Sequence, residues 1–229
     1  MLALFDIDGT LVRRAGPAHR NALVEAVRQV LGIETRNDNI PMHGKLDTEI
    51  LLEMMGHAGV GRRRARAALA KICRAAEEYY PRHVPVLRRK TCPGVRRLLA
   101  RLQRKGAVLG LVSGNLTRIG WKKLERADLA RYFQFGIFAQ MAPTRTDMVR
   151  LAVRHAEQHR WINGSSRRVL IGDTPNDVTA GRANGIETIA VATGVCPLEE
   201  LEASGATLCA PDLTDPSFRE WISRAFDHA

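Results

Sequence analysis

Two aspartates, Asp6 and Asp8, stand one residue apart directly after the apolar run Leu2–Phe5. Residues two apart in an extended chain point to the same side, so both carboxylates can face one site. Asp173 and Asp177 lie in a second acidic stretch, IGDTPND, which also follows an apolar run. Buried carboxylates at close range repel one another unless a cation joins them, and Mg²⁺ suits a few carboxylates together with a phosphate. The pattern therefore predicts a magnesium site.

A third polar stretch, Ser113 with Gly114 and Asn115, follows the apolar run Ala107–Val112 and precedes a helical pattern. A hydroxyl and backbone amides at the start of a helix can cradle an anion. A cation site, a phosphate cradle and a carboxylate that is free to attack together indicate phosphoryl transfer.

The elements that must position these residues are short apolar runs, which are typical of buried parallel strands, alternating with helical patterns. The expected strands are Leu2–Phe5, Ala107–Val112, Phe135–Ala139, Val169–Ile171 and Thr188–Ala192, with a weaker one at Ala206–Cys209. The expected helices between them cover residues 93–106, 117–129, 146–159 and 176–184. This alternation predicts an α/β fold with a Rossmann-like, doubly wound parallel sheet, whose ligand sites form beyond the carboxyl ends of the strands.

Residues 15–90 interrupt this alternation with helical segments alone. A first helix can start at Pro17 and stop at Gly32, and two more are expected over Asp47–Met55 and Arg62–Tyr80. We therefore expect two units: a catalytic core made of residues 1–14 and 91–229, and a small α-helical domain made of residues 15–90.

The composition narrows the function classes. No apolar run in the 229 residues approaches the ~20 residues that span a membrane, so no membrane contact is expected. The four cysteines lie far apart, which favours a reducing cytoplasm over a disulfide framework. The formal net charge of +11 can steer small anionic substrates or attract nucleic acid. Its densest cluster, from Gly61 to Arg74, has apolar residues at helical spacing and no interleaved aromatics, so we prefer the small-molecule interpretation.

The stretches DIDGT, LVSGN and IGDTPND, in this order and spacing, resemble the haloacid dehalogenase superfamily of phosphohydrolases. The resemblance covers essentially the whole chain, and the helical insertion is placed like the cap domain of that family. Within the family, the segments CPGVRRLL and GNLTRIGWKKLE are most similar to the phosphoglycolate-phosphatase branch.

The resemblance implies a role for each motif residue. Asp6 would attack phosphorus to form an aspartyl-phosphate, and Asp8 would protonate the leaving oxygen and then deprotonate the incoming water. Ser113 and the amides of Gly114 and Asn115 would hold the phosphoryl oxygens. Thr10, in the first motif, is a further candidate phosphate ligand.

The resemblance also implies the metal ligands. Asp6, the backbone carbonyl of Asp8 and Asp173 would hold Mg²⁺, with Asp177 in support. A metal-bound carboxylate stays ionised and can attack, whereas its neighbour away from the metal can carry a proton.

One position departs from the family pattern, which places a lysine before the last metal motif. The last lysine of this chain is Lys123. We expect Arg145 to replace the family lysine beside the nucleophile, because arginine offers a permanent charge and a forked set of donors. Lys122 and Lys123 are the alternative candidates for this role. The remaining interpretation is that Arg145 is an exposed residue near the start of a helix and has no role in the site.

The stretch PMHGKLDTEIL supplies the candidates for substrate contacts from the cap, His43, Lys45 and Asp47. Lys45 offers a charge to an anionic substrate, while Gly44 permits a close approach. The alternative is that Lys45 is solvated and Asp47 caps the following helix.

These features lead to a phosphatase, dependent on Mg²⁺, that acts on a small phosphorylated metabolite. Asp8 favours phosphate-ester chemistry over carbon–halogen cleavage, since members of the family that cleave other bonds lack an acid there. A phosphomutase similar to β-phosphoglucomutase is the first alternative, and a non-catalytic protein that binds anions or nucleic acid is the second.

Overall fold

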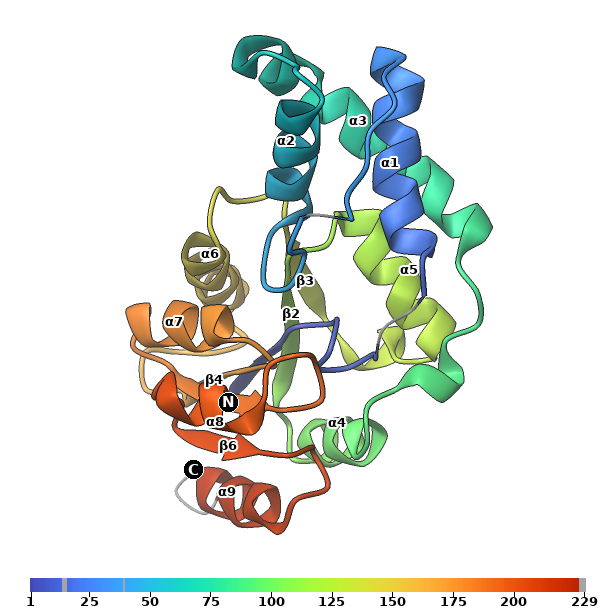
Figure 1. Ribbon diagram of the computed structural model, residues 1–229. Helices are drawn as coiled ribbons and strands as arrows, with labels where there is room; N and C mark the ends of the chain where they lie inside the picture. Colours follow the sequence, from blue (N-terminus) through green and yellow to red (C-terminus); the bar gives the residue numbers. More distant parts are fainter. Residues whose placement is uncertain (14–15, 39, 227–229) are drawn as a thin grey trace.

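A six-stranded parallel sheet forms the centre of the computed structural model, which describes residues 1–13, 16–38 and 40–226 (Figure 1). The strands lie in the order β3-β2-β1-β4-β5-β6. Their bounds are β1 Leu2–Phe5, β2 Val108–Ser113, β3 Phe135–Phe138, β4 Arg168–Gly172, β5 Glu187–Val191 and β6 Leu208–Ala210. Strand β1 pairs with β2 on one side and β4 on the other, and its four side chains are fully buried. The expected α/β fold with a Rossmann-like sheet is confirmed.

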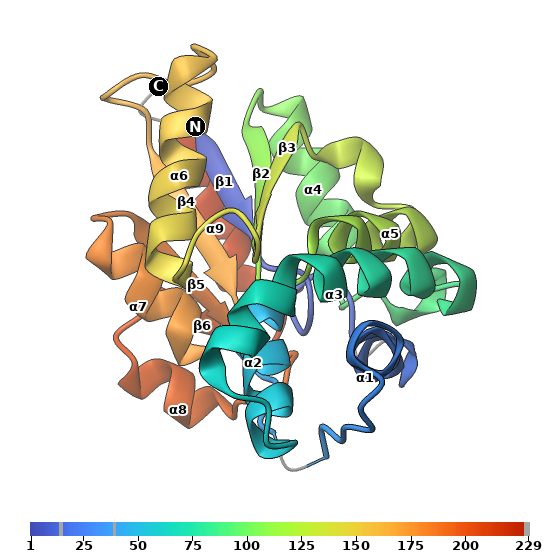
Figure 2. The ribbon, with the colours of Figure 1, turned by 90° about the horizontal axis from the view of Figure 1, so that it is seen from above.

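Helices cover both faces of the sheet. In Figure 2, α6 and α7 lie on one side of the strands and α4 and α5 on the other. Residues such as Leu98 and Leu102 of α4 are buried at helical spacing, as the sequence predicted. The helices of this part of the chain are α4 Val95–Arg104, α5 Thr117–Ala127, α6 Arg145–Gln158, α7 Pro175–Ala183, α8 Leu198–Ala203 and α9 Pro216–Phe226, with short 3₁₀ turns η1 Arg88–Lys90 and η2 Ala130–Tyr132.

Helices α8 and α9 were not among the expected elements. α8 has six residues, which is too few for a clear period. α9 has buried Phe218, Trp221 and Ile222 at the spacing of a helix face, a signal that the sequence interpretation did not use. The Trp221 indole donates a hydrogen bond to Glu187 at 3.0 Å, which ties α9 to β5.

Three helices between β1 and α4 form a separate layer over one end of the sheet (Figure 1). They are α1 Ala18–Leu31, α2 Asp47–His57 and α3 Arg62–His83, and both α1 and α2 pack against α3. α1 ends at Gly32, which adopts a left-handed conformation with φ of 65°, as is usual for a glycine after a helix. We refer to these three helices as the helical layer. Within the described residues, no helix is both long and apolar enough to span a membrane.

The two chain segments that connect the helical layer to the core lie side by side. Val12 forms an antiparallel bridge with Thr91, and the Arg13 amide donates to the Lys90 carbonyl at 2.7 Å. This pairing anchors both ends of the helical layer beside β1. Of the two predicted domain boundaries, the one between residues 14 and 15 falls outside the described residues, and the division into core and cap stays a proposal.

Candidate active site

The ends of three neighbouring strands bring the motif residues together. Asp6 and Asp8 follow β1, Ser113 ends β2, and Asp173 follows β4. β1 lies between β2 and β4, so the carboxyl ends of the three strands open on one site. These four residues line a cavity of about 770 Å³, which the helical layer also lines through residues such as Asp47. A cavity of this size holds a small ligand.

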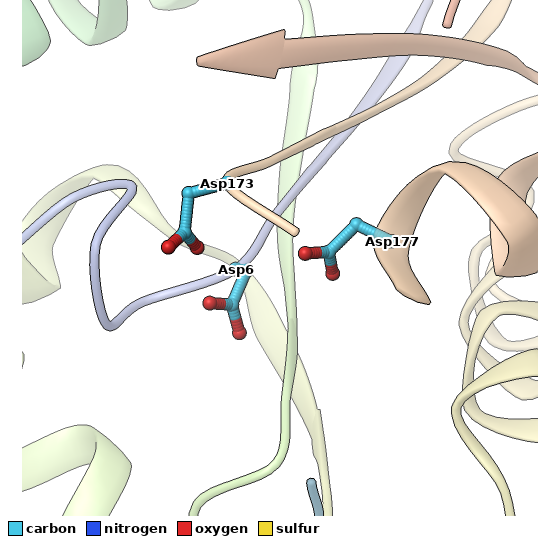
Figure 3. A group of neighbouring side chains, drawn as sticks. All are labelled: Asp6, Asp173 and Asp177. Atoms are coloured by element: carbon cyan, nitrogen blue, oxygen red, sulfur yellow. The ribbon is translucent and has the colours of Figure 1, made fainter. Parts of the chain in front are cut away.

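Three aspartates form what we call the carboxylate cluster: Asp6, Asp173 and Asp177. Each offers one oxygen, and these oxygens lie within 4.8 Å of one another. Figure 3 shows that Asp6 and Asp173 come from the two strand ends and that Asp177 points in from the start of α7. Glycines permit this crowding, because a Cβ at Gly9 or Gly194 would overlap the carboxylate of Asp173.

Burial and mutual repulsion disfavour the charged forms of this cluster. The three side chains are buried. Burial, together with the charges of Asp177 and Asp8, raises the pKa of Asp6 to about 7, although the Arg145 guanidinium opposes the rise. The pKa of Asp173 is raised well above its ordinary value, first by burial and then by the charges of Asp6 and Asp177. Three hard oxygen donors that repel one another fit a divalent cation, and Mg²⁺ in particular suits such a set.

Arg145, at the start of α6, supplies the positive charge that the structure shows beside the carboxylate cluster. Its Nη1 lies 2.6 Å from Asp177 Oδ1 and 3.3 Å from Asp6 Oδ1. The side chain is only 9% exposed, so the alternative of a solvated Arg145 does not hold. Although burial alone would lower the pKa of the Arg145 guanidinium, the charges of Asp177 and Asp6 raise it. Among the described residues, the buried Nε of Arg145 has no hydrogen-bond partner.

Asp177 lies in the first turn of α7 and is held there by Thr174. The Thr174 hydroxyl donates to Asp177 Oδ2 at 2.7 Å, while Oδ1 accepts from Arg145. Gly172 leaves room for this side chain, because a Cβ there would overlap it. Asp177 therefore holds Arg145 in place from the side of α7.

Asp8 enters a different group, which we call the lysine cluster: Asp8, Lys123, Asn115 and His19. Lys123 Nζ lies 2.7 and 2.6 Å from the two carboxylate oxygens of Asp8. The same ammonium donates to Asn115 Oδ1 at 2.6 Å and lies 3.1 Å from His19 Nδ1. Lys123 is almost fully buried at 1% exposure, whereas 40% of the Asp8 side chain is exposed. The carboxylate of Asp8 thus stays open to the cavity.

The lysine cluster favours the charged form of Asp8. Partial removal from bulk water inside the cavity would raise the pKa of Asp8, but the charges of Lys123 and His19 and the hydrogen bonds from Lys123 and Asn115 outweigh this effect. The resulting pKa lies below the ordinary value of an aspartate. Asp6 and Asp8 therefore have pKa shifts in opposite directions.

A polar chain runs from the lysine cluster into the helical layer. His19, in α1, bonds through Nε2 to Asp47 Oδ2 at 2.9 Å. The same Asp47 oxygen accepts from the Leu116 amide at 2.8 Å, and the Asp47 amide donates to the Gly114 carbonyl at 2.7 Å. Asp47 at the start of α2 therefore joins the helical layer to the segment before α5.

The expected phosphate cradle adjoins the lysine cluster, with which it shares Asn115. Asn115 Nδ2 donates to Ser113 Oγ at 2.8 Å and to Asp8 Oδ2 at 2.7 Å. Gly114 lies against the segment that precedes α2, because a Cβ on Gly114 would overlap the Lys45 carbonyl. Ser113, Gly114 and Asn115 all line the cavity.

Two expected substrate contacts have other partners in the structure. The Thr10 side chain is fully buried and its hydroxyl donates to Asp173 Oδ1 at 3.2 Å, so it supports a carboxylate of the cluster in place of a phosphate. Lys45 lines the cavity, but its ammonium is 2.6 Å from Glu53 Oε2 on the next helix. His43 lines the same cavity.

Sequence reasoning missed His19 and gave Lys123 a different partner. It placed Lys123 as an alternative beside the nucleophile Asp6, whereas the structure pairs it with Asp8. One signal was available, because Lys123 lies on the buried face of α5 with Ile119 and Leu124. A lysine on an apolar helix face requires a buried partner. His19 carried no comparable signal.

Comparison with known proteins shows which family the chain belongs to. The chain matches the haloacid dehalogenase-like hydrolase family over residues 1–185. A phosphoglycolate phosphatase of Caulobacter vibrioides is 29% identical over 217 residues, which cover 92% of this chain and 86% of the relative. A phosphoglycolate phosphatase of Pseudomonas savastanoi pv. phaseolicola is 26% identical over 247 residues, covering 96% and 87%. The crystal structure of a β-phosphoglucomutase from Clostridium difficile has the same fold, with a TM-score of 0.71, 16% identity and coverage of 99% and 97%.

The chain belongs to the haloacid dehalogenase-like hydrolases. Within that family it is a phosphatase, a hydrolase of phosphoric monoesters, as the sequence motifs predicted.

Proposed function

We propose that the protein hydrolyses a small phosphorylated metabolite, with Mg²⁺ as cofactor and an aspartyl-phosphate on Asp6 as intermediate. The observation that carries this proposal is the contrast between Asp6 and Asp8. Asp6 lies among carboxylates that a cation can join, whereas Asp8 lies open to the cavity with a lysine holding both of its oxygens. One aspartate is thus suited to attack and the other to proton transfer.

The carboxylate cluster would hold the metal. Asp6 and Asp173 supply oxygens from the two strand ends, and Asp177 stands behind them with Arg145. Bound Mg²⁺ would neutralise charge on the phosphoryl oxygens and keep Asp6 ionised. Arg145 adds a fixed cation at the same place and would serve in place of the lysine that the family pattern leads us to expect.

The first chemical step uses both aspartates. A carboxylate oxygen of Asp6 attacks phosphorus, the bond from phosphorus to the ester oxygen breaks, and Asp8 gives its proton to the departing oxygen. The negative phosphoryl group beside Asp8 raises the pKa of that carboxyl, which favours the protonated form that this step needs. Ser113 and Asn115 would hold the phosphoryl oxygens.

The second step returns the enzyme to its starting state. Asp8, now a carboxylate held by Lys123, takes a proton from a water molecule that attacks phosphorus. The bond between phosphorus and Asp6 breaks, phosphate leaves and the Asp6 carboxylate is restored. The helical layer over the cavity limits access of other water while the intermediate exists.

The substrate is a small phosphate ester, and the matched relatives named phosphoglycolate phosphatase support a two-carbon acid as the first compound to test. A phosphomutase similar to β-phosphoglucomutase stays the alternative, and the β-phosphoglucomutase structure that shares the fold at 16% identity does not carry an activity. We also place the enzyme in the cytoplasm, a proposal supported by four cysteines that are all unpaired.

A phosphate-release assay tests this proposal. Glycolate, sugar and nucleotide phosphates are compared with Mg²⁺ and with a chelator, for the natural protein, for Asp6→Asn and for the exposed control Asp38→Asn. We expect turnover that needs Mg²⁺ and disappears in Asp6→Asn alone. Turnover that persists in the chelator, or full activity in Asp6→Asn, would overturn the mechanism.

A further inference from the structure

Three cations at the cavity have no carboxylate partner in the described part of the chain. Each acidic side chain that lines the cavity has a partner of its own: Arg145 for Asp6, Lys123 for Asp8, His19 for Asp47 and Thr10 for Asp173. Lys45 is paired with Glu53, so three cationic residues that line the cavity remain outside these pairs: Arg13, Arg20 and Lys90. The cavity therefore has positive charge that its own residues do not neutralise.

Two of these cations lie on chain segments that are bonded to each other. Arg13 follows Val12 and Lys90 precedes Thr91, the two residues of an isolated antiparallel bridge, and the Arg13 amide donates to the Lys90 carbonyl at 2.7 Å. Lys90 is the last residue of η1, and the side chains of Arg13 and Lys90 are both exposed. Both residues line the cavity, so two like charges are available at the place where a ligand would bind.

An anion bound by both side chains would offset their positive charges. The backbone pairing fixes the spacing of the two residues before any ligand arrives, which lowers the cost of ordering them. Arg20 adds a third cation from the first turn of α1, where its Nε donates to the sulfur of Met42 at 3.1 Å. A phosphoryl group bound at Ser113 would already have Arg145 and the expected metal beside it. The anion that Arg13, Arg20 and Lys90 fit is therefore a second one.

We propose that Arg13 and Lys90, with Arg20, bind a second anionic group of the substrate, either a carboxylate or a further phosphate. The enzyme then prefers phosphate esters with an anionic tail over esters of equal size with a neutral tail. This inference rests on the proposed phosphatase function, and it assigns the specificity to the two connecting segments.

Four esters that share a two-carbon tail test the inference: phosphoglycolate, 2-hydroxyethyl phosphate, ethylene glycol bisphosphate and 2-aminoethyl phosphate. We expect kcat/KM of the natural protein to be about 10- to 100-fold higher for an anionic tail than for the hydroxyl tail. The ratio between the carboxylate and the bisphosphate identifies which anion is the better fit. Arg63→Gln, an exposed arginine of α3 outside the cavity, serves as the matched control and should keep the ratio of the natural protein.

The variants locate the preference. In the double variant Arg13→Gln with Lys90→Gln, we expect the ratio of anionic to neutral tails to fall to within about 3-fold of unity. The single variant Lys90→Glu should shift the preference towards the aminoethyl tail, and it keeps the test informative if the double variant does not fold.

Two results would overturn the inference while leaving the phosphatase intact. One is equal kcat/KM for anionic and neutral tails in the natural protein, and the other is an unchanged ratio in both variants. The proposed function itself would be overturned by a different result: no hydrolysis of these four esters or of any other phosphate ester, whichever divalent cation is added.

Discussion

Asp6 and Asp8 leave the same strand end two residues apart, but their side chains enter opposite surroundings. The carboxylate cluster gathers three buried acids around Arg145, and it raises the pKa of Asp6 to about 7, mainly through burial. The lysine cluster gives Asp8 a buried ammonium and an amide, which hold the pKa of Asp8 below its ordinary value although the cavity partly removes it from water. Two aspartates only two residues apart can therefore differ in their protonation chemistry, because their surroundings differ.

The two clusters also differ in where their parts come from. The carboxylate cluster is built from two strand ends and from helix α7, and Arg145 of α6 pairs with it. The lysine cluster includes His19 of the helical layer, and through it Asp47 of α2. A change in the position of the helical layer would consequently alter the hydrogen bonds of the lysine cluster around Asp8, whereas Asp6 would keep its partners. Substitutions in one cluster should therefore leave the other largely intact.

The largest effect is expected for Asp6→Asn, which removes the attacking oxygen. Activity should fall at least about 10³-fold, as it does when other enzymes lose a nucleophile. The thermal midpoint in a chelator should stay equal or rise, because the change removes a buried charge from among Asp173 and Asp177. Phosphate release and thermal unfolding check both parts. Activity above a tenth of the natural level would contradict the assignment.

Arg145→Met should lower the free energy of unfolding by about 3–5 kcal/mol in a chelator, because it leaves buried carboxylates without their cation. Added Mg²⁺ should recover part of the loss by taking over that charge. Urea unfolding with and without Mg²⁺ measures both values. Arg150→Met, an exposed arginine of the same helix that pairs with Asp147, is the control and should change little. Equal stability of Arg145→Met and the natural protein in the chelator would contradict the prediction.

Lys123→Met should lower kcat by about 10²-fold, because Asp8 loses the group that orients both of its oxygens and general acid–base catalysis contributes about 10²- to 10⁴-fold. The affinity for Mg²⁺ should change far less, since the lysine cluster lies apart from the carboxylate cluster. Lys122→Met provides a matched control one residue away, where the ammonium pairs with Glu125 at the surface. A larger effect on Mg²⁺ affinity than on kcat would show that Lys123 serves Asp6.

The smallest effect is a shift in thermal stability. At Mg²⁺ concentrations about 100 times the dissociation constant, stabilisation should reach about 2.7 kcal/mol, which corresponds to a rise of about 5–10 °C for a chain of this size. The rise should be much smaller in Asp173→Asn and should persist in Asp8→Asn. An equal loss in the two variants would show that the clusters are not separate in their metal binding.

Most of the sheet could be predicted from the sequence because its strands are continuous apolar runs. The motif aspartates could be placed at strand ends because they directly follow these apolar runs. A functional role could be inferred for them because core packing does not require carboxylates at such positions. The role of Arg145 was accessible through the absence of a lysine after Lys123. Burial of that side chain then depended on Asp177, a residue 32 positions further along the chain.

The lysine cluster could not be derived in the same way. Its members come from α1, β1, the end of β2 and α5, and no local pattern states which of them meet. Lys45 and Thr10 show the same limit, because their partners Glu53 and Asp173 depend on packing between elements. Contacts of this kind follow from the fold as a whole.

The claim that Asp6 attacks and Asp8 transfers protons is tested most directly by trapping the intermediate. The enzyme is mixed with substrate and Mg²⁺, quenched within a turnover and reduced with borohydride, which converts an aspartyl-phosphate to homoserine. Mass spectrometry of the tryptic peptide of residues 1–13 then locates the change. We predict homoserine at position 6 with Asp8 unmodified, and no modification in Asp6→Asn. Homoserine at position 8, or turnover without any trapped aspartate, would contradict the account.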